Sequence, residues 1–123
     1  MPKEVTNPIT AHQVTWMDSE FGWVRLLNGA KDAGYIYFIP DSSPLKVPAL
    51  NSDGSYIIFS VHLSHLGLLL SILRDEKPLQ IRFFDPEAGG VAPSAFIEPV
   101  SGLVDSAKVA HAFEKLRNVT DRR

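Results

Sequence analysis

Apolar and polar residues alternate along several short segments of the chain, and many of the apolar ones are β-branched or aromatic. Alternation with a period of two is typical of β-strands, because successive side chains point to opposite faces of a sheet. Turn-forming Asn, Asp, Gly and Pro residues separate the segments. The pattern predicts five strands, over residues 14–27, 35–39, 56–61, 79–83 and 95–100. Residues 40–54, which are rich in proline, predict a long loop.

Two other segments repeat apolar residues every three or four positions, which is the spacing of one helix face. The first stripe consists of Leu66, Leu69, Leu70 and Leu73. Ser64 stands where an N-cap is expected, and Pro78 prevents continuation of the helix. The second stripe consists of Val109, Ala112, Phe113 and Leu116. We therefore expect one helix between the third and fourth strands and a C-terminal helix that Asp105 caps.

Together these elements predict a mainly antiparallel α+β fold. Parallel neighbours need a long crossover, usually a helix, and none is predicted among the first three strands or between the last two. Closing five strands into a small barrel would remove exposed sheet edges. We expect such a barrel, built by residues 14–123 as a single domain. The polar residues 1–13 contain prolines and predict a loose N-terminal arm.

The central part of the chain resembles a known fold in its layout. A strand at residues 56–61, a helix at residues 64–77 and an alternating strand at residues 78–84 follow one another. This order resembles the OB-fold, a small five-stranded barrel, and also resembles the B subunits of some bacterial AB5 toxins. The resemblance implies a barrel that binds a partner. It does not choose among nucleic acid, glycan and protein, because the OB-fold serves all three.

Composition excludes several classes of function. The 123 residues include no cysteine, which excludes disulfides, zinc–thiolate sites and cysteine nucleophiles. Twelve basic and 14 acidic side chains give a formal net charge of −2. This balance provides no overall attraction to nucleic acid or to an anionic membrane.

The distribution of apolar residues bears on the cellular compartment. No apolar run of the signal-peptide type follows the N-terminus. The most apolar segment, residues 57–73, is interrupted by Ser and His and is shorter than the roughly 20 residues of a membrane helix. We therefore expect a cytoplasmic protein without a membrane partner. Gly89 and Gly90 lack the lysine of a phosphate-binding loop, and no cofactor is expected.

His62 and His65 are candidates for chemistry. Two histidines three residues apart can share a metal if both lie on one helix face, but these lie at a predicted strand–helix junction. Hydrogen bonding to the backbone is the simpler interpretation, so no metal site is predicted. A small enzyme that uses His62 or His65 as general base is one alternative function.

Aromatic and basic residues on the predicted strands mark a candidate binding surface. We assign ligand binding to Trp23, Tyr35, Tyr37 and Arg82. Aromatic platforms with interleaved cations also bind single-stranded nucleic acid. So few cations surround these positions that such binding would be weak, and nucleic acid is the second alternative.

Self-association is a further expectation. The predicted strands 35–39 and 56–61 are apolar on both faces, and Leu68 and Ile72 widen the apolar surface of the leucine helix. A helix that is apolar nearly all round is buried on several sides, which either a second subunit or the C-terminal helix could provide. We therefore predict a non-catalytic binding or assembly module, a homo-oligomer that presents its aromatic surface to a small ligand, glycan or protein.

Overall fold

The computed structural model describes residues 2–76, 78–100 and 118–119. Strands dominate the regular structure of this part of the chain. In chain order the elements are β1 (Lys3–Ile9), β2 (Ala11–Trp16), β3 (Gly22–Asn28), β4 (Lys31–Ile39), β5 (Ala49–Leu50), β6 (Ile57–His62), the 3₁₀ turn η1 (Leu63–His65), α1 (Leu66–Asp75), β7 (Leu79–Asp85), β8 (Ser94–Pro99) and β9 (Asn118–Val119). None of the helices in the described ranges has the length and apolar character needed to cross a membrane.

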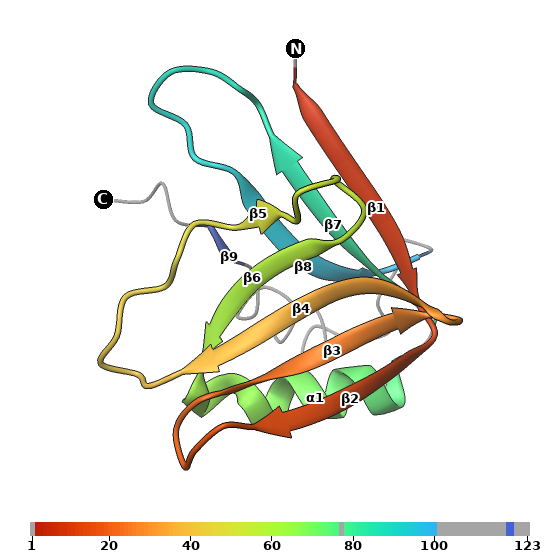
Figure 1. Cartoon of the computed structure of the whole chain (residues 1–123), viewed down its shortest axis with the longest axis vertical. Coiled ribbons are helices and arrows are strands. Elements are labelled where there is room, and N and C mark those ends of the chain that lie inside the picture. The colour runs from red at the N-terminus through yellow and green to blue at the C-terminus, as the bar shows by residue number, and fades with distance from the viewer. Residues whose placement is uncertain (1, 77, 101–117, 120–123) are drawn as a thin grey trace.

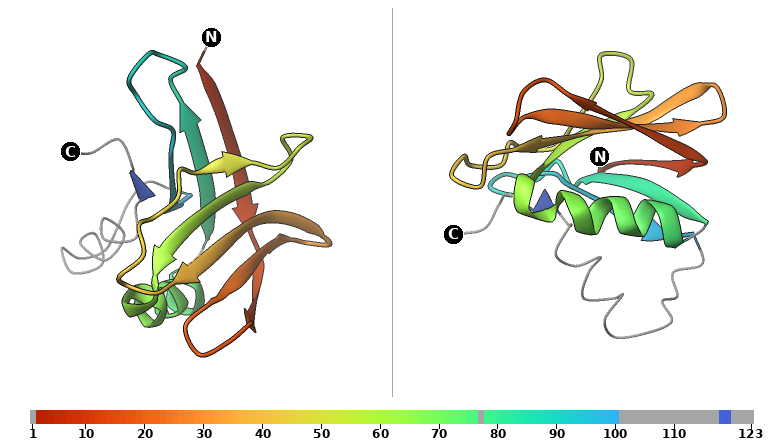
Figure 2. Two further views of the ribbon diagram at one scale, coloured as in Figure 1. Left: turned by 60° about the vertical axis from the view of Figure 1, so that its left-hand side comes forward. Right: turned by 90° about the horizontal axis from the view of Figure 1, so that it is seen from below.

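The strands form two sheets that pack in layers (Figures 1 and 2). The four-stranded sheet has the order β1-β7-β8-β9, and the five-stranded sheet has the order β2-β3-β4-β6-β5. The two sets of strands run in crossing directions, and α1 lies on the same side of the five-stranded sheet as the other layer (Figure 2). β1 belongs to the four-stranded sheet and β2 to the five-stranded sheet, although only Thr10 separates them. The N-terminal segment therefore crosses from one layer to the other at this residue.

The predicted closed five-stranded barrel is wrong, because the strands belong to two open sheets. Most pairs are antiparallel, but β4 and β6 are parallel, with Gly34 opposite Ile57 and Ile39 opposite His62. Residues 40–56 return the chain across the sheet without a helix, and β5 within them pairs antiparallel with β6. A proline-rich loop thus supplies the crossover that we had expected only from a helix.

The N-terminal residues, which were expected to form a loose arm, instead form β1 and the beginning of β2. β1 pairs with β7 along its whole length. The Asn7 side-chain amide donates to the carbonyls of Ala33 and Ser55, both at 3.0 Å. Pro8 is compatible with a strand because β1 lies at the edge of its sheet, where one row of backbone groups needs no partner.

Residues 14–27, predicted as one strand, divide between β2 and β3. A tight turn joins the two strands, in which the backbone N–H groups of Met17 and Asp18 donate to the carbonyl of Phe21. The Asp18 carboxylate in turn accepts the N–H of Glu20 at 2.8 Å. Short-range hydrogen bonds of this kind are typical of Asp in turns and reverse the chain inside an otherwise strand-forming segment.

The core lies between the two sheets and includes one face of α1. Its fully buried side chains come from alternating positions of the central strands and from the helix; the largest are Phe38, Leu26, Ile36, Ile57, Leu69, Ile81 and Val24. Gly34 permits the close approach of β4 to its neighbours, since a Cβ atom there would lie 2.8 Å from the carbonyl oxygen of Ile57 and from Cδ1 of Ile81.

The leucine helix forms as predicted, with a shift at its start. Its buried residues are Leu66, Leu69, Ile72 and Leu73, whereas Leu70 is half-buried. Ser64 is not the N-cap, because it lies in η1 and α1 begins two residues later with His65 in the N-cap position. The N–H of Ser64 donates to Oδ1 of Asp41 at 3.0 Å. The predicted C-terminal helix lies outside the described residues.

Candidate functional site

The outer face of the five-stranded sheet carries a group of aromatic side chains. We call this surface the aromatic face and define it by Phe21, Trp23, Tyr35, Tyr37 and Tyr56. On β3 and β4 these residues alternate with core residues, so the side chains that are half-buried point away from the core. Trp23 of β3 lies opposite Tyr37 of β4 in the antiparallel register. Three of the four residues assigned to ligand binding therefore share one surface.

Ring contacts organise the aromatic face. The Tyr37 ring lies 6.0 Å from that of Phe21 in a stacked arrangement and 5.8 Å from that of Trp23 in a tilted one. Tyr35 makes a tilted contact with Tyr56 at 5.3 Å. Such pairs contribute about 0.5–1.5 kcal/mol each beyond area burial. The rings are thereby held in place before any partner binds.

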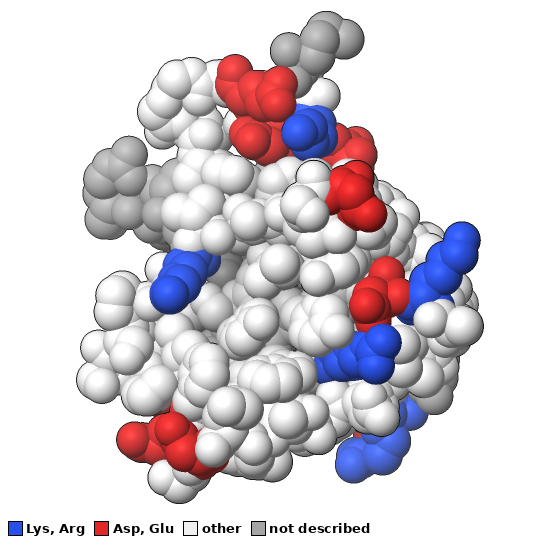
Figure 3. Space-filling model, viewed as in Figure 1, with Lys and Arg blue, Asp and Glu red and all other residues white. Residues whose placement is uncertain are grey.

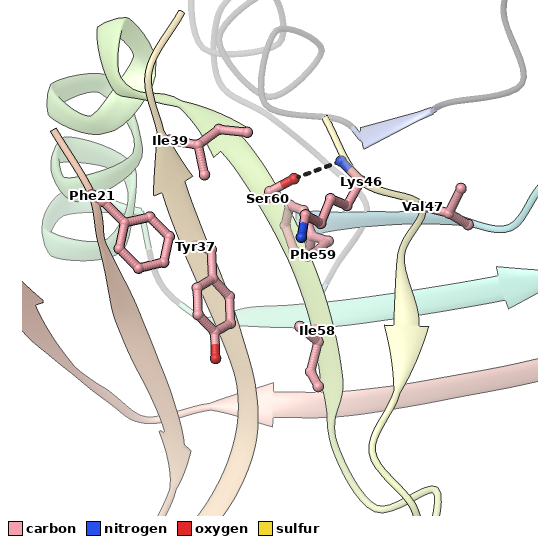
Figure 4. Close-up of a pocket in the computed structure, with 8 residues that line it drawn as sticks. All are labelled: Phe21, Tyr37, Ile39, Lys46, Val47, Ile58, Phe59 and Ser60. Atoms are coloured by element: carbon pink, nitrogen blue, oxygen red, sulfur yellow. Dashed lines mark hydrogen bonds between the residues drawn. The ribbon is translucent and has the colours of Figure 1, made fainter. Parts of the chain in front are cut away.

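A pocket of about 310 Å³ opens on the aromatic face. It lies between β4, β6 and the loop that precedes β5 (Figure 4). Apolar and aromatic side chains form most of its walls, and the complete lining is Phe21, Tyr37, Ile39, Lys46, Val47, Ile58, Phe59 and Ser60. A concave, mainly apolar site with a few polar groups is the usual character of a small-molecule site.

Two polar groups lie at the loop side of this pocket. The hydroxyl of Ser60, which is 4% exposed, accepts the backbone N–H of Lys46 at 3.2 Å. This hydrogen bond fixes the loop on β6. The Lys46 side chain then runs back over β6 (Figure 4). Elsewhere this side of the molecule is largely uncharged, with most acidic and basic groups at its margins (Figure 3).

An ion pair flanks the aromatic face at the β3–β4 end. Nε of Arg25 donates to Oδ1 of Asp32 at 2.6 Å. The hydrogen bond to Asp32 raises the pKa of Arg25 above its usual value. Burial, with the Asp32 charge adding to it, raises the pKa of the neighbouring Tyr35 phenol. Tyr35 therefore stays protonated at neutral pH and can donate a hydrogen bond.

Arg82, the fourth predicted residue, is not part of this surface. It lies on β7 of the four-stranded sheet, where its guanidinium is 3.4 Å from Glu4 and 3.7 Å from Glu98. Its Cζ also lies 5.2 Å from the centre of the Phe96 ring. These contacts engage Arg82 in cross-strand pairing within its own sheet.

The two candidate histidines occupy the junction between β6 and α1. The Nε2 atom of His62 lies 2.8 Å from the carbonyl oxygen of Ser43, which ties the long loop to the end of β6. This contact matches the interpretation of a junction histidine bonded to the backbone. Within the described ranges no group of three or more His, Asp or Glu side chains could hold a metal ion.

Sequence reasoning missed the half of the pocket that β6 and the loop supply. Ile58 was expected only as part of the apolar strand at residues 56–61, and Lys46 was not assigned to the binding surface. The signal available was that residues 56–61 are apolar on both faces of the strand. A strand of this kind is usually covered on both faces, which indicates that other residues pack on its outer face. The parallel pairing of β4 with β6, which aligns Tyr37 with Ser60, has no comparable signal in the sequence.

Comparisons with known proteins do not place this chain in a family. It matches no protein-family model, no curated protein and no solved structure.

Proposed function

We propose that the chain is a non-catalytic binding module whose pocket takes a small ligand with an apolar body and an acidic group. The observation that carries this proposal is the pocket of about 310 Å³ on the aromatic face. This volume lies at the lower end of the range for small-molecule sites. A ligand the size of a single substituted aromatic ring fits such a space.

The lining determines the chemistry of the ligand. Aromatic and aliphatic walls favour an apolar body, because its transfer from water gains about 25 cal/mol for each Å² that is buried. Lys46 is the charged residue among the eight that line the pocket. An acidic group on the ligand would therefore be oriented toward the loop, and its neutral analogue would bind more weakly.

The same lining supports binding over catalysis. None of its eight residues is His, Asp or Glu, the side chains that most often act as general acids or bases. The Ser60 hydroxyl is buried and occupied by the Lys46 backbone N–H, so it lacks the setting of an activated nucleophile. A single lysine also falls short of the cationic groove that single-stranded nucleic acid requires.

A titration with 3-phenylpropionate, followed by NMR of the ¹⁵N-labelled protein, tests the proposal. The chain contains two tryptophans, so two indole N–H signals are expected. Trp23 contacts Tyr37 at the pocket, whereas Trp16 contacts Phe38 of the core. We expect the ligand to shift the Trp23 signal and leave that of Trp16 nearly unchanged. The neutral 3-phenylpropanol should bind about tenfold more weakly, which corresponds to loss of one charge-assisted contact.

Two exposed valines provide a matched pair of variants. Val47 lines the pocket and is 54% exposed, whereas Val91 lies in the β7–β8 connection and is 45% exposed. Val47→Trp should fill the pocket and remove the Trp23 shift, and Val91→Trp should leave it intact. Equal binding to both variants, or ligand-induced shifts confined to another surface, would show that this pocket is not the site.

A further inference from the structure

The four sheet edges in the described part of the chain differ in how they are protected from other strands. Edge strands expose backbone N–H and C=O groups, and proteins usually shield them with charge, proline or short length. β1 carries Lys3, Glu4 and Pro8, while β5 and β9 are each two residues long. β2 has six residues, AHQVTW, with no Lys, Arg, Asp, Glu or Pro. It is the edge with none of these devices.

Backbone groups of β2 alternate between β3 and the open edge. The N–H of Met17, just after β2, donates to the carbonyl of Phe21 at 2.8 Å. In an antiparallel ladder every second residue makes such bonds. Alternation therefore directs the backbone N–H and C=O groups of Gln13 and Thr15 toward β3. Those of Val14 and Trp16 point toward the open edge, where the sheet ends. Figure 1 shows β2 as the outermost strand of its sheet at the lower margin of the molecule.

We propose that the β2 edge pairs antiparallel with the β2 edge of a second copy of this chain. A strand that pairs with itself about a two-fold axis places its own residues opposite one another, so any charge near the centre would meet a like charge. The absence of Lys, Arg, Asp and Glu from β2 removes this repulsion. Trp16 and Met17, which are 53% and 60% exposed at the end of the strand, add apolar surface to the contact.

The symmetry of the pairing determines its register. Residues directly opposite each other in antiparallel strands place their side chains on the same face of the sheet. Val14 and Trp16 supply the outward backbone groups, so a two-fold axis at Val14 places those groups of the two strands opposite one another. In this register Gln13 of one copy lies opposite Thr15 of the other. A two-fold axis normal to the sheet also keeps both aromatic faces on the same side of the doubled sheet.

The contact should produce a weak dimer. A six-residue strand together with the side chain of Met17 provides an interface at the small end of specific contacts, below about 1,200 Å² in total. We therefore expect a reversible monomer–dimer equilibrium with a Kd in the range of about micromolar to millimolar. This inference does not depend on the ligand proposed for the pocket.

Variants with double substitutions at Gln13 and Thr15 test the proposal. The dimer Kd of each is measured by sedimentation velocity on the full chain across a concentration series. Gln13→Glu with Thr15→Glu places like charges opposite each other twice per dimer, and the dimer Kd should rise about tenfold or more. Gln13→Glu with Thr15→Lys places opposite charges there, and the Kd should stay within about threefold of the original or fall.

A third variant separates local repulsion from net charge. Gln13→Lys with Thr15→Lys shifts the net charge of −2 in the opposite direction, yet it should weaken the dimer as Gln13→Glu with Thr15→Glu does. Circular dichroism of each variant establishes that folding is intact. A chain that stays monomeric to millimolar concentration, or a dimer that all three variants form equally well, would overturn the proposal.

Discussion

Asp41 shows how a single exposed carboxylate can join two segments that are distant in the sequence. It lies in the loop after β4, and its Oδ1 accepts the N–H of Ser64 in η1. An acidic group at this position satisfies one of the backbone donors that a helical start leaves without a partner. The sequence indicated a cap at this place but offered the local Ser64 side chain for it. A partner 23 residues away is not visible to local pattern analysis.

Replacement of Asp41 by asparagine should remove part of the pH dependence of stability. The hydrogen bonds from Ser64 lower the pKa of Asp41 in the folded state. The ionised carboxylate therefore stabilises the fold above its unfolded pKa of about 3.9, and this contribution is lost as the pH falls through the lower folded pKa. Urea unfolding should show that Asp41→Asn is less stable than the original protein at pH 7. This difference should narrow as the pH is lowered from about 5 toward 2.

The control for this prediction removes an exposed carboxylate elsewhere. Glu20→Gln removes a carboxylate in the β2–β3 turn that is not part of the Asp41–Ser64 contact, and it should not reproduce the pH-dependent loss of stability seen for Asp41→Asn. A stability difference for Asp41→Asn that stays constant over the whole pH range would contradict the assigned role of the ionised carboxylate.

At the scale of elements, β1 marks where local sequence reasoning was least successful. Residues 1–13 are polar and contain prolines, which on their own indicate a loose segment. What makes residues 3–9 a strand is a distant partner, β7, which covers β1 along its length. The alternation of half-buried Val5 and Ile9 with exposed Thr6 is visible in retrospect. Periodicity over so few apolar residues is weak, whereas the longer stripe of α1 was sufficient to locate the helix.

Alanine substitutions on opposite faces of β1 distinguish a strand from a loose arm. Val5 packs against the core, whereas Thr6 is exposed. Val5→Ala should lower the free energy of unfolding by about 1–2 kcal/mol, because two methyl groups lose their packing. Thr6→Ala should change it by less than about 0.5 kcal/mol. Chemical denaturation measures both, and a neutral Val5→Ala would mean that β1 does not contribute to the folded core.

At the scale of the whole molecule, two open sheets replace the closed barrel that the strand count suggested. The sequence predicted most of the strands and the leucine helix, but it did not contain a signal for which strands are neighbours. Pairing of β4 with β6 depends on Gly34, where the absence of a side chain lets Ile57 and Ile81 approach. Trp23, Tyr35 and Tyr37 were predicted as a group from their residue types. The β6 side of the pocket was not predicted, because it depends on the pairing of β4 with β6.

An open sheet leaves an exposed edge strand, and hydrogen exchange measures how strongly each backbone amide of that strand is protected. Val14 and Trp16 direct their N–H groups to the open side of β2, and Gln13 and Thr15 direct theirs to β3. At concentrations well below the dimer Kd, exchange along β2 should therefore alternate, fast at Val14 and Trp16 and slower at the other two. Amides of the buried central strand β4 should be the slowest, since they exchange mainly through global unfolding.

The concentration dependence of this alternation links the fold to the proposed dimer. Pairing of two β2 edges gives the amides of Val14 and Trp16 carbonyl partners, so the alternation should fade as the protein concentration rises through the Kd. General stabilisation by contact at another surface would slow all amides by a similar factor and leave the alternation in place. NMR-detected exchange at two concentrations separates these outcomes. Alternation that persists in the dimer excludes the β2 edge as the interface, and its absence in the monomer would mean that β2 is not an open edge.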